Sequence, residues 1–228
     1  SAALTELADR FFTDLARGSS EHPVCAATVD TALRWNIPTA HFEAFIESMQ
    51  MDLHIGHYDT YADLEKYVYG SAAVIGLQMV PILEPSSERA YGYAKDLGYA
   101  FQLANFIRDV GEDLDRERIY LPLDELAQFG VTANDVRSRV VTDQFREALK
   151  FQIARVRRLE SASRPGIELL SPDSQPCIET ARILYCGIVD EVEKNDYQVF
   201  TTRAKVPLGR RLAVAIPGWQ KARRARRR

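Results

Sequence analysis

The spacing of apolar residues is helical along almost the whole chain, and this feature restricts the fold more than any other. Apolar side chains recur every three or four residues in segments such as ALTELADRFFTDLARG and CIETARILYCGIVDEVEKNDYQVF. No stretch shows the alternation of polar and apolar residues between turn signals that is typical of a strand. We therefore predict an all-α protein. No repeat or low-complexity linker divides the 228 residues, so we expect one helical domain over residues 1–208 and a basic tail over 209–228.

Cysteine usage and hydropathy limit where the protein can act. Cys25, Cys177 and Cys186 form no CxxC pair, which favours a reducing compartment, and we predict a cytoplasmic location. The longest uncharged run covers residues 67–83 and is interrupted by glycine, glutamine and proline. It is shorter than the roughly 20 apolar residues of a spanning helix, so we interpret it as a buried core helix. The chain opens without methionine and without a signal peptide pattern, which suggests a fragment of something longer.

Basic residues are concentrated at the C-terminus. Residues 210–228 hold eight Lys or Arg and no acid, which leaves 21 basic against 32 acidic residues, a net charge of −11, in the remainder. The segment KARRARRR is either a disordered solubilising tail or a contact with the anionic inner face of a membrane, where each basic residue contributes about 1 kcal/mol. We do not expect a nucleic-acid partner, because the acidic body would repel phosphate.

The stretch NFIRDVGEDLDRERIYLP, residues 105–122, carries the densest group of charges. On a helix, Gln102, Asn105, Asp109 and Asp113 share one polar stripe, and the two aspartates lie one turn apart. Paired carboxylates with this spacing suit Mg²⁺, which takes one or two of them and completes its shell with water and phosphate. The competing interpretation is a solvated helix end with an ion pair between Glu112 and Arg116. A lone DxxxD does not decide between the two.

Other polar pairs in the chain are weaker candidates. Asp59 and Asp63 form a second DxxxD, but Thr60 precedes Asp63 by three residues, so we interpret this segment as a helix cap. His54 and His57 have a spacing that a metal site could use, and we expect them to be structural or exposed. Asp52, which precedes the uncharged run, is a further candidate to face the pocket.

The whole string LGYAFQLANFIRDVGEDLDRERIYLPLDEL closely resembles the second aspartate-rich region of the squalene/phytoene synthase family, in its bacterial phytoene synthase branch. The segments FEAFIESMQMDL, YDTYADLEKYVYGSAAVIGLQMVPIL and ARILYCGIVDEVEKNDYQVFTTRAKV resemble further parts of the same family in the same order. The resemblance implies an all-α isoprenoid-synthase fold around a central cavity, and an enzyme of isoprenoid and carotenoid biosynthesis.

The chemistry implied by the resemblance is head-to-head condensation of two prenyl diphosphates. Geranylgeranyl diphosphate would give phytoene through a cyclopropyl diphosphate, with Mg²⁺, or Mn²⁺ in its place, on the leaving group. A squalene or dehydrosqualene type of synthase that uses farnesyl diphosphate is the alternative.

Roles for individual residues follow from the same resemblance. Asp109 and Asp113 match the metal-binding aspartates, and Tyr197 and Arg203 match an aromatic and a basic residue that close the site. The residues predicted to bind substrate are Tyr69, Gly70, Ala73, Gln102, Asn105 and Arg108. For Tyr69, Gly70 and Ala73, close packing between helices is an equally consistent interpretation.

One departure from the family pattern concerns the first aspartate-rich motif, which we do not find. Asp9 and Asp14 are five residues apart, the wrong spacing for one helical face. We therefore expect that the N-terminal part of the fold, with the first motif, is missing from residues 1–228. A non-catalytic family member that serves as a scaffold or assembly factor is the rival hypothesis. The sequence does not establish an oligomeric state.

Overall fold

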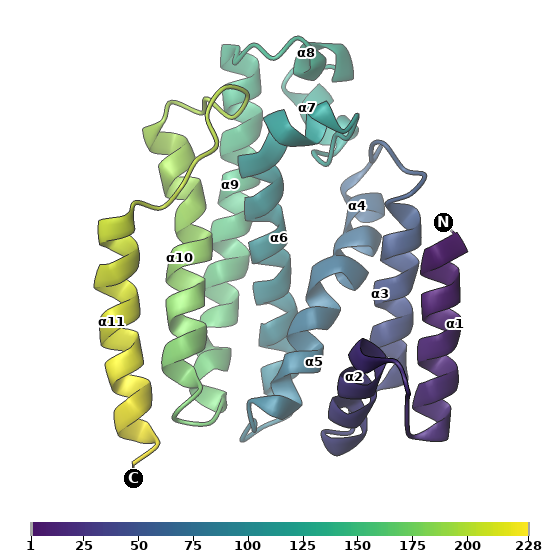
Figure 1. Cartoon of the computed structure of the whole chain (residues 1–228). Coiled ribbons are helices and arrows are strands. Elements are labelled where there is room, and N and C mark those ends of the chain that lie inside the picture. Colours follow the sequence, from purple (N-terminus) through teal and green to yellow (C-terminus); the bar gives the residue numbers. More distant parts are fainter. Residues whose placement is uncertain (1, 228) are drawn as a thin grey trace.

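A computed structural model describes residues 2–227, and within that range the regular secondary structure is entirely helical (Figure 1). The prediction of an all-α protein is therefore confirmed. The α-helices are α1 (Ala2–Arg17), α2 (Pro23–Arg34), α3 (Thr39–Met51), α4 (Tyr61–Val68), α5 (Val74–Ile82), α6 (Arg89–Asp115), α7 (Leu123–Gln128), α8 (Ala133–Arg137), α9 (Asp143–Ser163), α10 (Gln175–Lys194) and α11 (Leu208–Ala225). A π-helical turn, η1 (Tyr69–Ala73), joins α4 to α5, and a 3₁₀ helix, η2 (Arg164–Leu169), follows α9.

The longest helix, α6, lies in the middle of the molecule and packs against α5, α9, α10, η1 and η2 (Figure 1). Its buried face includes Ala100, Leu103, Ala104 and Ile107, whose spacing of three and four residues follows the helical period. The facing side of α9 contributes residues such as Leu149 and completes one continuous apolar core. Because α6 also carries the acidic stretch, the same helix anchors the core and positions the candidate site.

The uncharged run 67–83 is helical, but it is not one regular helix. The π turn at Tyr69–Ala73 inserts an extra residue, a feature that is frequent at functional sites. On one side, a Cβ added to Gly70 would lie 2.0 Å from the carbonyl oxygen of Ala44. The absence of a side chain at position 70 therefore allows α3 to pack closely against the π turn. On the other side, Ile75 and Met79 are exposed, which corrects the interpretation of the run as wholly buried.

Helix α4 begins at the cap that the sequence predicted. The backbone N–H of Asp63 donates to Thr60 Oγ1 at 3.2 Å, and Thr60 Oγ1 donates to the Asp63 carboxylate at 2.7 Å. Asp59 is exposed and lies 3.6 Å from His57. The structure thus confirms a cap at this DxxxD.

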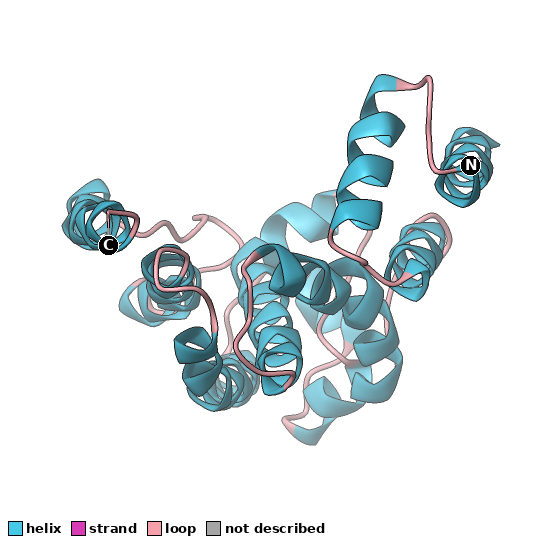
Figure 2. Ribbon diagram, turned by 90° about the horizontal axis from the view of Figure 1, so that it is seen from below, coloured by secondary structure: helices cyan, strands magenta, loops and turns pink. Residues whose placement is uncertain are grey.

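The C-terminal basic residues continue a helix. Helix α11 begins at Leu208, one residue before the expected tail, and packs along α10 at an outer edge of the molecule, opposite α1 (Figure 2). Arg210 forms ion pairs with Asp190 and Glu191 of α10, each at 3.1 Å. The interpretation of KARRARRR as a disordered tail is therefore wrong for residues 221–225, which are helical. No helix within residues 2–227 is both long and apolar enough to cross a membrane.

Candidate active site

Asp109 lies near the C-terminal end of α6, between two arginines. The guanidinium of Arg108 donates to both carboxylate oxygens, at 2.7 and 2.5 Å, and that of Arg203 donates to the same two oxygens at 2.8 and 3.2 Å. Burial opposes ionisation, but these charge-assisted bonds hold the pKa of Asp109 below its ordinary value. Arg203 also approaches Glu112 at 3.4 Å, whereas no ion pair joins Glu112 to Arg116 within the described chain. The structure thus brings together Arg108, Asp109 and Arg203, all of which the sequence analysis assigned to the site.

Asp113, one turn further along α6, has a different environment. No hydrogen bond or ion pair to its carboxylate is formed within residues 2–227, and it lines a small cavity with Arg118 and Tyr120. Burial, reinforced by the negative charge of Asp109, raises the pKa of Asp113 to about 7. One carboxylate of the pair is therefore held ionised by arginines, while its neighbour binds a proton readily at neutral pH.

Asp52, at the end of α3, extends this acidic region. Tyr120 and Tyr67 donate from their hydroxyl groups to the Asp52 carboxylate at 2.8 and 3.3 Å, and Arg118 donates to the Asp52 carbonyl oxygen at 2.8 Å. The rings of Tyr67 and Tyr120 stack with centroids 5.6 Å apart. Asp52 is close enough for its charge to contribute to the raised pKa of Asp113. Asp52 therefore lies near the carboxylates of α6, and that it faces the pocket stays a prediction.

Gly111 holds the loop that carries Arg203 against α6. Its N–H donates to the carbonyl oxygen of Val199 at 3.3 Å, and an added Cβ would lie 2.8 Å from that oxygen and 2.9 Å from the carbonyl oxygen of Phe200. A side chain at position 111 would therefore push the loop outward. This explains physically why a glycine lies between the two aspartates.

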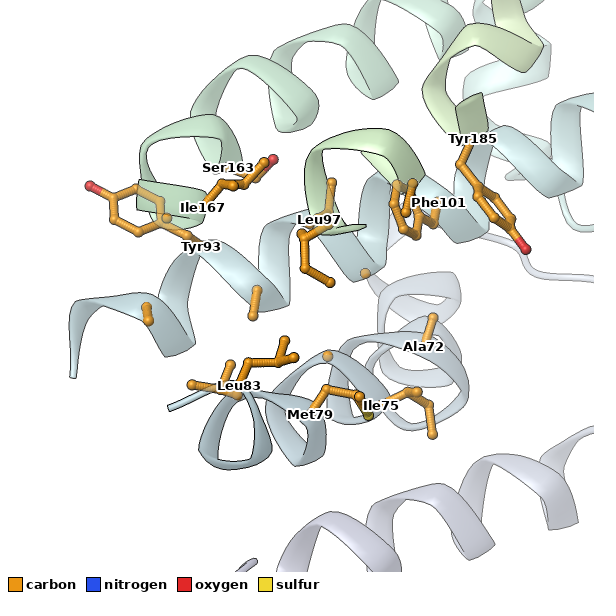
Figure 3. A pocket seen from close by; sticks show the side chains of 18 of the residues that line it. Ala72, Ile75, Met79, Leu83, Tyr93, Leu97, Phe101, Ser163, Ile167 and Tyr185 are labelled. Atoms are coloured by element: carbon orange, nitrogen blue, oxygen red, sulfur yellow. The ribbon is translucent and has the colours of Figure 1, made fainter. Parts of the chain in front are cut away.

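An apolar cavity of about 340 Å³ extends along α6 away from the carboxylates (Figure 3). Its walls come from η1, α5, α6, η2 and α10, and they include Ala72, Ile75, Met79, Leu97, Phe101 and Tyr185. Ile75, Met79 and Tyr185 remain 40–45% exposed, so the cavity is open along one side. The predicted cavity is thus present, with an apolar lining suited to a hydrocarbon chain.

Asn105 connects the cavity to the carboxylates, because it lines the cavity and precedes Asp109 by one turn. Its Oδ1 atom and the hydroxyl of Ser71, another lining residue, are buried without a hydrogen-bond partner in the described chain. Such orphaned polar atoms are rare in folded proteins and suit a missing polar ligand. Gln102 lies half-buried on the same helix, one turn before Asn105.

The other predicted substrate-binding residues lie outside this cavity. Gly70 packs against α3, and Ala73 is fully buried where Gly98 of α6 approaches η1, so both occupy packing positions. Tyr69 lines a separate open hollow between α3, α4 and α6.

Tyr197 is buried at the turn after α10, with the Lys150 ammonium 5.9 Å from its ring. Its backbone N–H donates to the Val192 carbonyl oxygen, its ring lies beside Lys150 of α9, and its side chain forms no hydrogen bond to Asp109 or Asp113 within residues 2–227.

The donor set fits a magnesium ion in its chemistry. Asp109 and Asp113 supply hard oxygen ligands one turn apart, and Mg²⁺ commonly combines one or two carboxylates with water and phosphate oxygens. No cluster of three or more potential metal ligands occurs among residues 2–227, so most of the shell would come from water and substrate. At least one arginine has to release Asp109 before that carboxylate can bind a cation.

Three contributions to the site were missed by the sequence analysis. Tyr67 and Tyr120 were not singled out, although the position of Tyr120 directly after the acidic stretch was an available signal. The close approach of Gly111 to residues 199–200 has no local signal, because it joins segments almost ninety residues apart.

The geometry defines a helical protein with paired carboxylates and arginines at one end of an apolar cavity, an arrangement of the isoprenoid-synthase class. Solved structures share this fold. A squalene synthase, HpnC from Alicyclobacillus acidocaldarius, is 27% identical with a TM-score of 0.81, over 86% of this chain and 74% of that one. A dehydrosqualene synthase in complex with ligand is 25% identical with a TM-score of 0.89, over 98% of this chain and 79% of that one.

Sequence comparison identifies the family. The Squalene/phytoene synthase family matches residues 2–210. Phytoene synthase 1, chloroplastic, from Arabidopsis thaliana is 40% identical over 90% of this chain, and phytoene synthase from Arthrospira platensis is 38% identical over 86%. The chain therefore belongs to the squalene/phytoene synthase family, which confirms the resemblance. It spans 50% of the Arabidopsis protein and 67% of the Arthrospira protein.

Proposed function

We propose that this chain provides the second carboxylate pair and the prenyl-binding cavity of a phytoene synthase-like prenyltransferase, which condenses two geranylgeranyl diphosphates head to head. The observation that carries the proposal is the position of Asp109 between two arginines and one turn from Asp113, at the end of an apolar cavity that begins at Asn105. Similarity to phytoene synthases at 38–40% identity supports the same reaction.

In this proposal the arginines act on the diphosphate. Arg108 and Arg203 present planar guanidinium groups that fit phosphate oxygens as they fit the Asp109 carboxylate. A bound Mg²⁺ would neutralise the charge that develops on the leaving diphosphate. Asn105 orients polar atoms at the head of the substrate, and the walls formed by Leu97 and Phe101 hold its hydrocarbon chain away from water.

The proposed reaction balances without an oxidant or reductant. Cleavage of the C–O bond in one substrate releases diphosphate and leaves an allylic cation. The double bond of the second substrate attacks this cation, and loss of a proton closes a cyclopropyl diphosphate. Departure of the second diphosphate, rearrangement and loss of another proton give phytoene. The apolar walls protect the cations from water during these steps.

A synthase that uses farnesyl diphosphate is the second candidate. Similarity to the squalene synthase HpnC and to a dehydrosqualene synthase, at 27% and 25% identity, favours it. The two candidates share the same acidic site and differ in the length of chain that the cavity accepts. Dehydrosqualene would form by the same redox-neutral steps as phytoene, whereas squalene would need a hydride donor as a co-reactant.

Incubation of the complete gene product with each diphosphate and Mg²⁺ tests the proposal. We expect hydrocarbon from geranylgeranyl diphosphate, and at least about a 100-fold loss of kcat in Asp109→Asn and Asp113→Asn, since each removes a metal ligand. Asp59→Asn, at an exposed aspartate, is the matched control and should keep full activity. If neither diphosphate gives a product, or if both site variants keep full activity, the proposed enzymatic function is excluded and the scaffold hypothesis is favoured.

We further propose a cytoplasmic location. The three cysteines form no disulfide in the structure, and two of them, Cys25 and Cys186, are buried as thiols. Burial raises the pKa of the Cys186 thiol to about 12, which keeps it in the unreactive thiol form.

A further inference from the structure

A buried ion pair joins α7 to α9 at the end of the molecule where α6 carries its carboxylates (Figure 1). The Arg155 guanidinium donates to both carboxylate oxygens of Glu125, at 2.8 Å to Oε2. Gln152 Nε2 donates to the same oxygen at 2.7 Å, and its Oε1 accepts from Arg155 at 2.9 Å. Burial opposes ionisation of Glu125, but these bonds hold its pKa below its ordinary value. Because both charges are paired and hydrogen-bonded, the pair is a fixed contact between the two helices.

The same guanidinium also contacts the start of α4. Its central carbon lies 3.8 Å from the centre of the ring of Tyr61, the first residue of that helix, and 5.2 Å from the centre of the Phe151 ring. A planar guanidinium can stack on an aromatic face while its edge binds a carboxylate, which a lysine ammonium cannot do. Arg155 therefore holds both α4 and α7 to α9 through one group.

The chain segments that lead into α4 and α7 run side by side. Residues 52–60 connect α3 to α4, and residues 116–122 connect α6 to α7. Backbone hydrogen bonds of 2.9–3.0 Å join the two segments, from the N–H groups of Ile119, Leu123 and Asp124 to the carbonyl oxygens of Gly56, Tyr58 and Asp59. We name residues 52–60 and 116–124 the paired loops. Since both loops end at partners of Arg155, one guanidinium fixes the pair where it enters the helices.

The paired loops carry side chains to the carboxylates of α6. Arg118 and Tyr120 line the small cavity beside Asp113. The Tyr120 hydroxyl donates to the Asp52 carboxylate at 2.8 Å, and its ring stacks on Phe106 of α6 with centroids 4.2 Å apart. A displacement of the loops would therefore move the hydroxyl of Tyr120 and the guanidinium of Arg118 relative to Asp113.

We propose that Arg155 is a positioning residue, which holds the paired loops beside Asp113 through its contacts with α4 and α7. Within residues 2–227, Arg155 forms no hydrogen bond or ion pair with Asp109 or Asp113, so it acts only through the loops. Its effect on the reaction rests on the proposed function, whereas its effect on the position of Tyr120 does not.

Fluorine NMR tests the position of Tyr120 without substrate. 3-Fluorotyrosine introduced at position 120 alone reports the hydrogen bond to Asp52 and the stacking on Phe106. Arg155→Lys keeps the charge beside Glu125 but loses the bidentate contact and the stack, so we expect the resonance to shift or broaden by more than its own linewidth.

Arg182→Lys is the matched control. The side chain of Arg182 is 12% exposed against 13% for Arg155, and it binds Glu179 through two nitrogens on α10, away from the paired loops. Both variants should lower the urea midpoint of unfolding to a similar extent, but Arg182→Lys should leave the resonance at position 120 unchanged.

The contact with α4 provides an independent pair of variants. Tyr61→Leu removes the ring under the guanidinium and should disturb the same resonance, while Tyr61→Phe keeps the ring and should restore it. This pair leaves Arg155 and Glu125 in place, so it also tests the proposal if Arg155→Lys does not fold.

Steady-state kinetics of the complete gene product measure the consequence for the reaction. Arg155→Lys should lower kcat at least about tenfold and change KM less than about threefold, because it displaces groups beside Asp113 and leaves the apolar cavity intact. Tyr61→Phe and Arg182→Lys should keep both values.

The outcomes separate this proposal from the proposed function. An unchanged resonance in Arg155→Lys and Tyr61→Leu, or an equal change in Arg182→Lys, would overturn the positioning role. An unchanged kcat in an active Arg155→Lys enzyme would also overturn it. If the resonance moves as expected but the wild type forms no hydrocarbon, the proposed function fails and the positioning of Tyr120 by Arg155 is supported.

Discussion

At the scale of single residues, the two carboxylates of α6 differ because their neighbours differ. Asp109 receives four hydrogen bonds from two arginines, whereas Asp113 is half-buried without a cation bonded to it. In the absence of a cation, negative charge on Asp113 is unfavourable. The same feature that makes Asp113 a ready ligand for a divalent ion therefore lowers the stability of the ion-free protein.

This difference predicts a pH-dependent stability. Asp113 titrates at about 7 in the folded state against 3.8 as the ordinary value, so the folded protein binds more protons between these pH values. Its contribution to the free energy of unfolding therefore declines as the pH rises from about 4 to about 7. Asp113→Asn should stabilise the protein at pH 8 by about 1–2 kcal/mol, less than the full shift implies because the carboxyl is partly hydrated.

Urea unfolding in EDTA at pH 8 and pH 5 measures this effect. The gain should fall to roughly 40% of its pH 8 value at pH 5, because the unfolded carboxyl is still ionised there, and vanish only below about pH 4. Asp59→Asn, at an exposed carboxylate, should show no such pH dependence. Destabilisation by Asp113→Asn at pH 8 would contradict the prediction.

Arg203 supports a second prediction at this scale. Its guanidinium bonds Asp109 through two nitrogens, a geometry that a lysine ammonium cannot reproduce. Arg203→Lys should raise the KM for the prenyl diphosphate about tenfold, because charge remains but bidentate contact is lost. Steady-state kinetics would show this, with Arg158→Lys as the control at an exposed position. An unchanged KM would place Arg203 outside the diphosphate site.

At the scale of elements, the site depends on one close contact between α6 and the loop after α10. The N–H of Gly111 binds the Val199 carbonyl oxygen, and the chain between Asp196 and Arg203 passes over this point. Asp196 and Tyr197 adopt positive φ angles of 49° and 59°, which directs the chain from α10 back towards α6. The position of Arg203 is therefore set by the backbone of two elements.

Gly111→Ala tests this contact. The new Cβ would meet two carbonyl oxygens at 2.8–2.9 Å, so we expect a loss of about 1–3 kcal/mol in unfolding free energy and a raised KM as the loop moves. Gly92→Ala is a matched control, because Gly92 lies on the same helix with no atom within 4 Å of an added Cβ. That control should stabilise the protein by about 0.5–1 kcal/mol through helix propensity. Equal behaviour of the two variants would refute the contact as the cause.

At the scale of the whole molecule, the features that follow the helical period could be predicted and those that join distant segments could not. Periodicity predicted an all-α chain and one face for Asn105, Asp109 and Asp113, because both depend only on residues within one helix. The pairing of Asp109 with Arg203 was implied only by the family resemblance, since 94 residues separate them. No pattern of apolar residues marks the π turn at Tyr69–Ala73 in the sequence. The side of the helix on which Gly70 lies could therefore not be predicted.

The length of the cavity gives the last prediction, which concerns the choice of substrate. Ala94 lies on its wall about 16 Å along α6 from Asn105, in the part that only a longer prenyl chain is expected to fill. Ala94→Leu should reduce kcat/KM for geranylgeranyl diphosphate at least about tenfold, because overlap with a filled apolar pocket costs about 1–3 kcal/mol. The kcat/KM for farnesyl diphosphate should change much less, so the preference for geranylgeranyl over farnesyl diphosphate becomes smaller or reverses. Ala94→Ser keeps nearly the same volume and should leave that ratio unchanged. An equal loss for both substrates would show that the chain length is selected elsewhere, since a wall at this depth can discriminate only against the chain that reaches it.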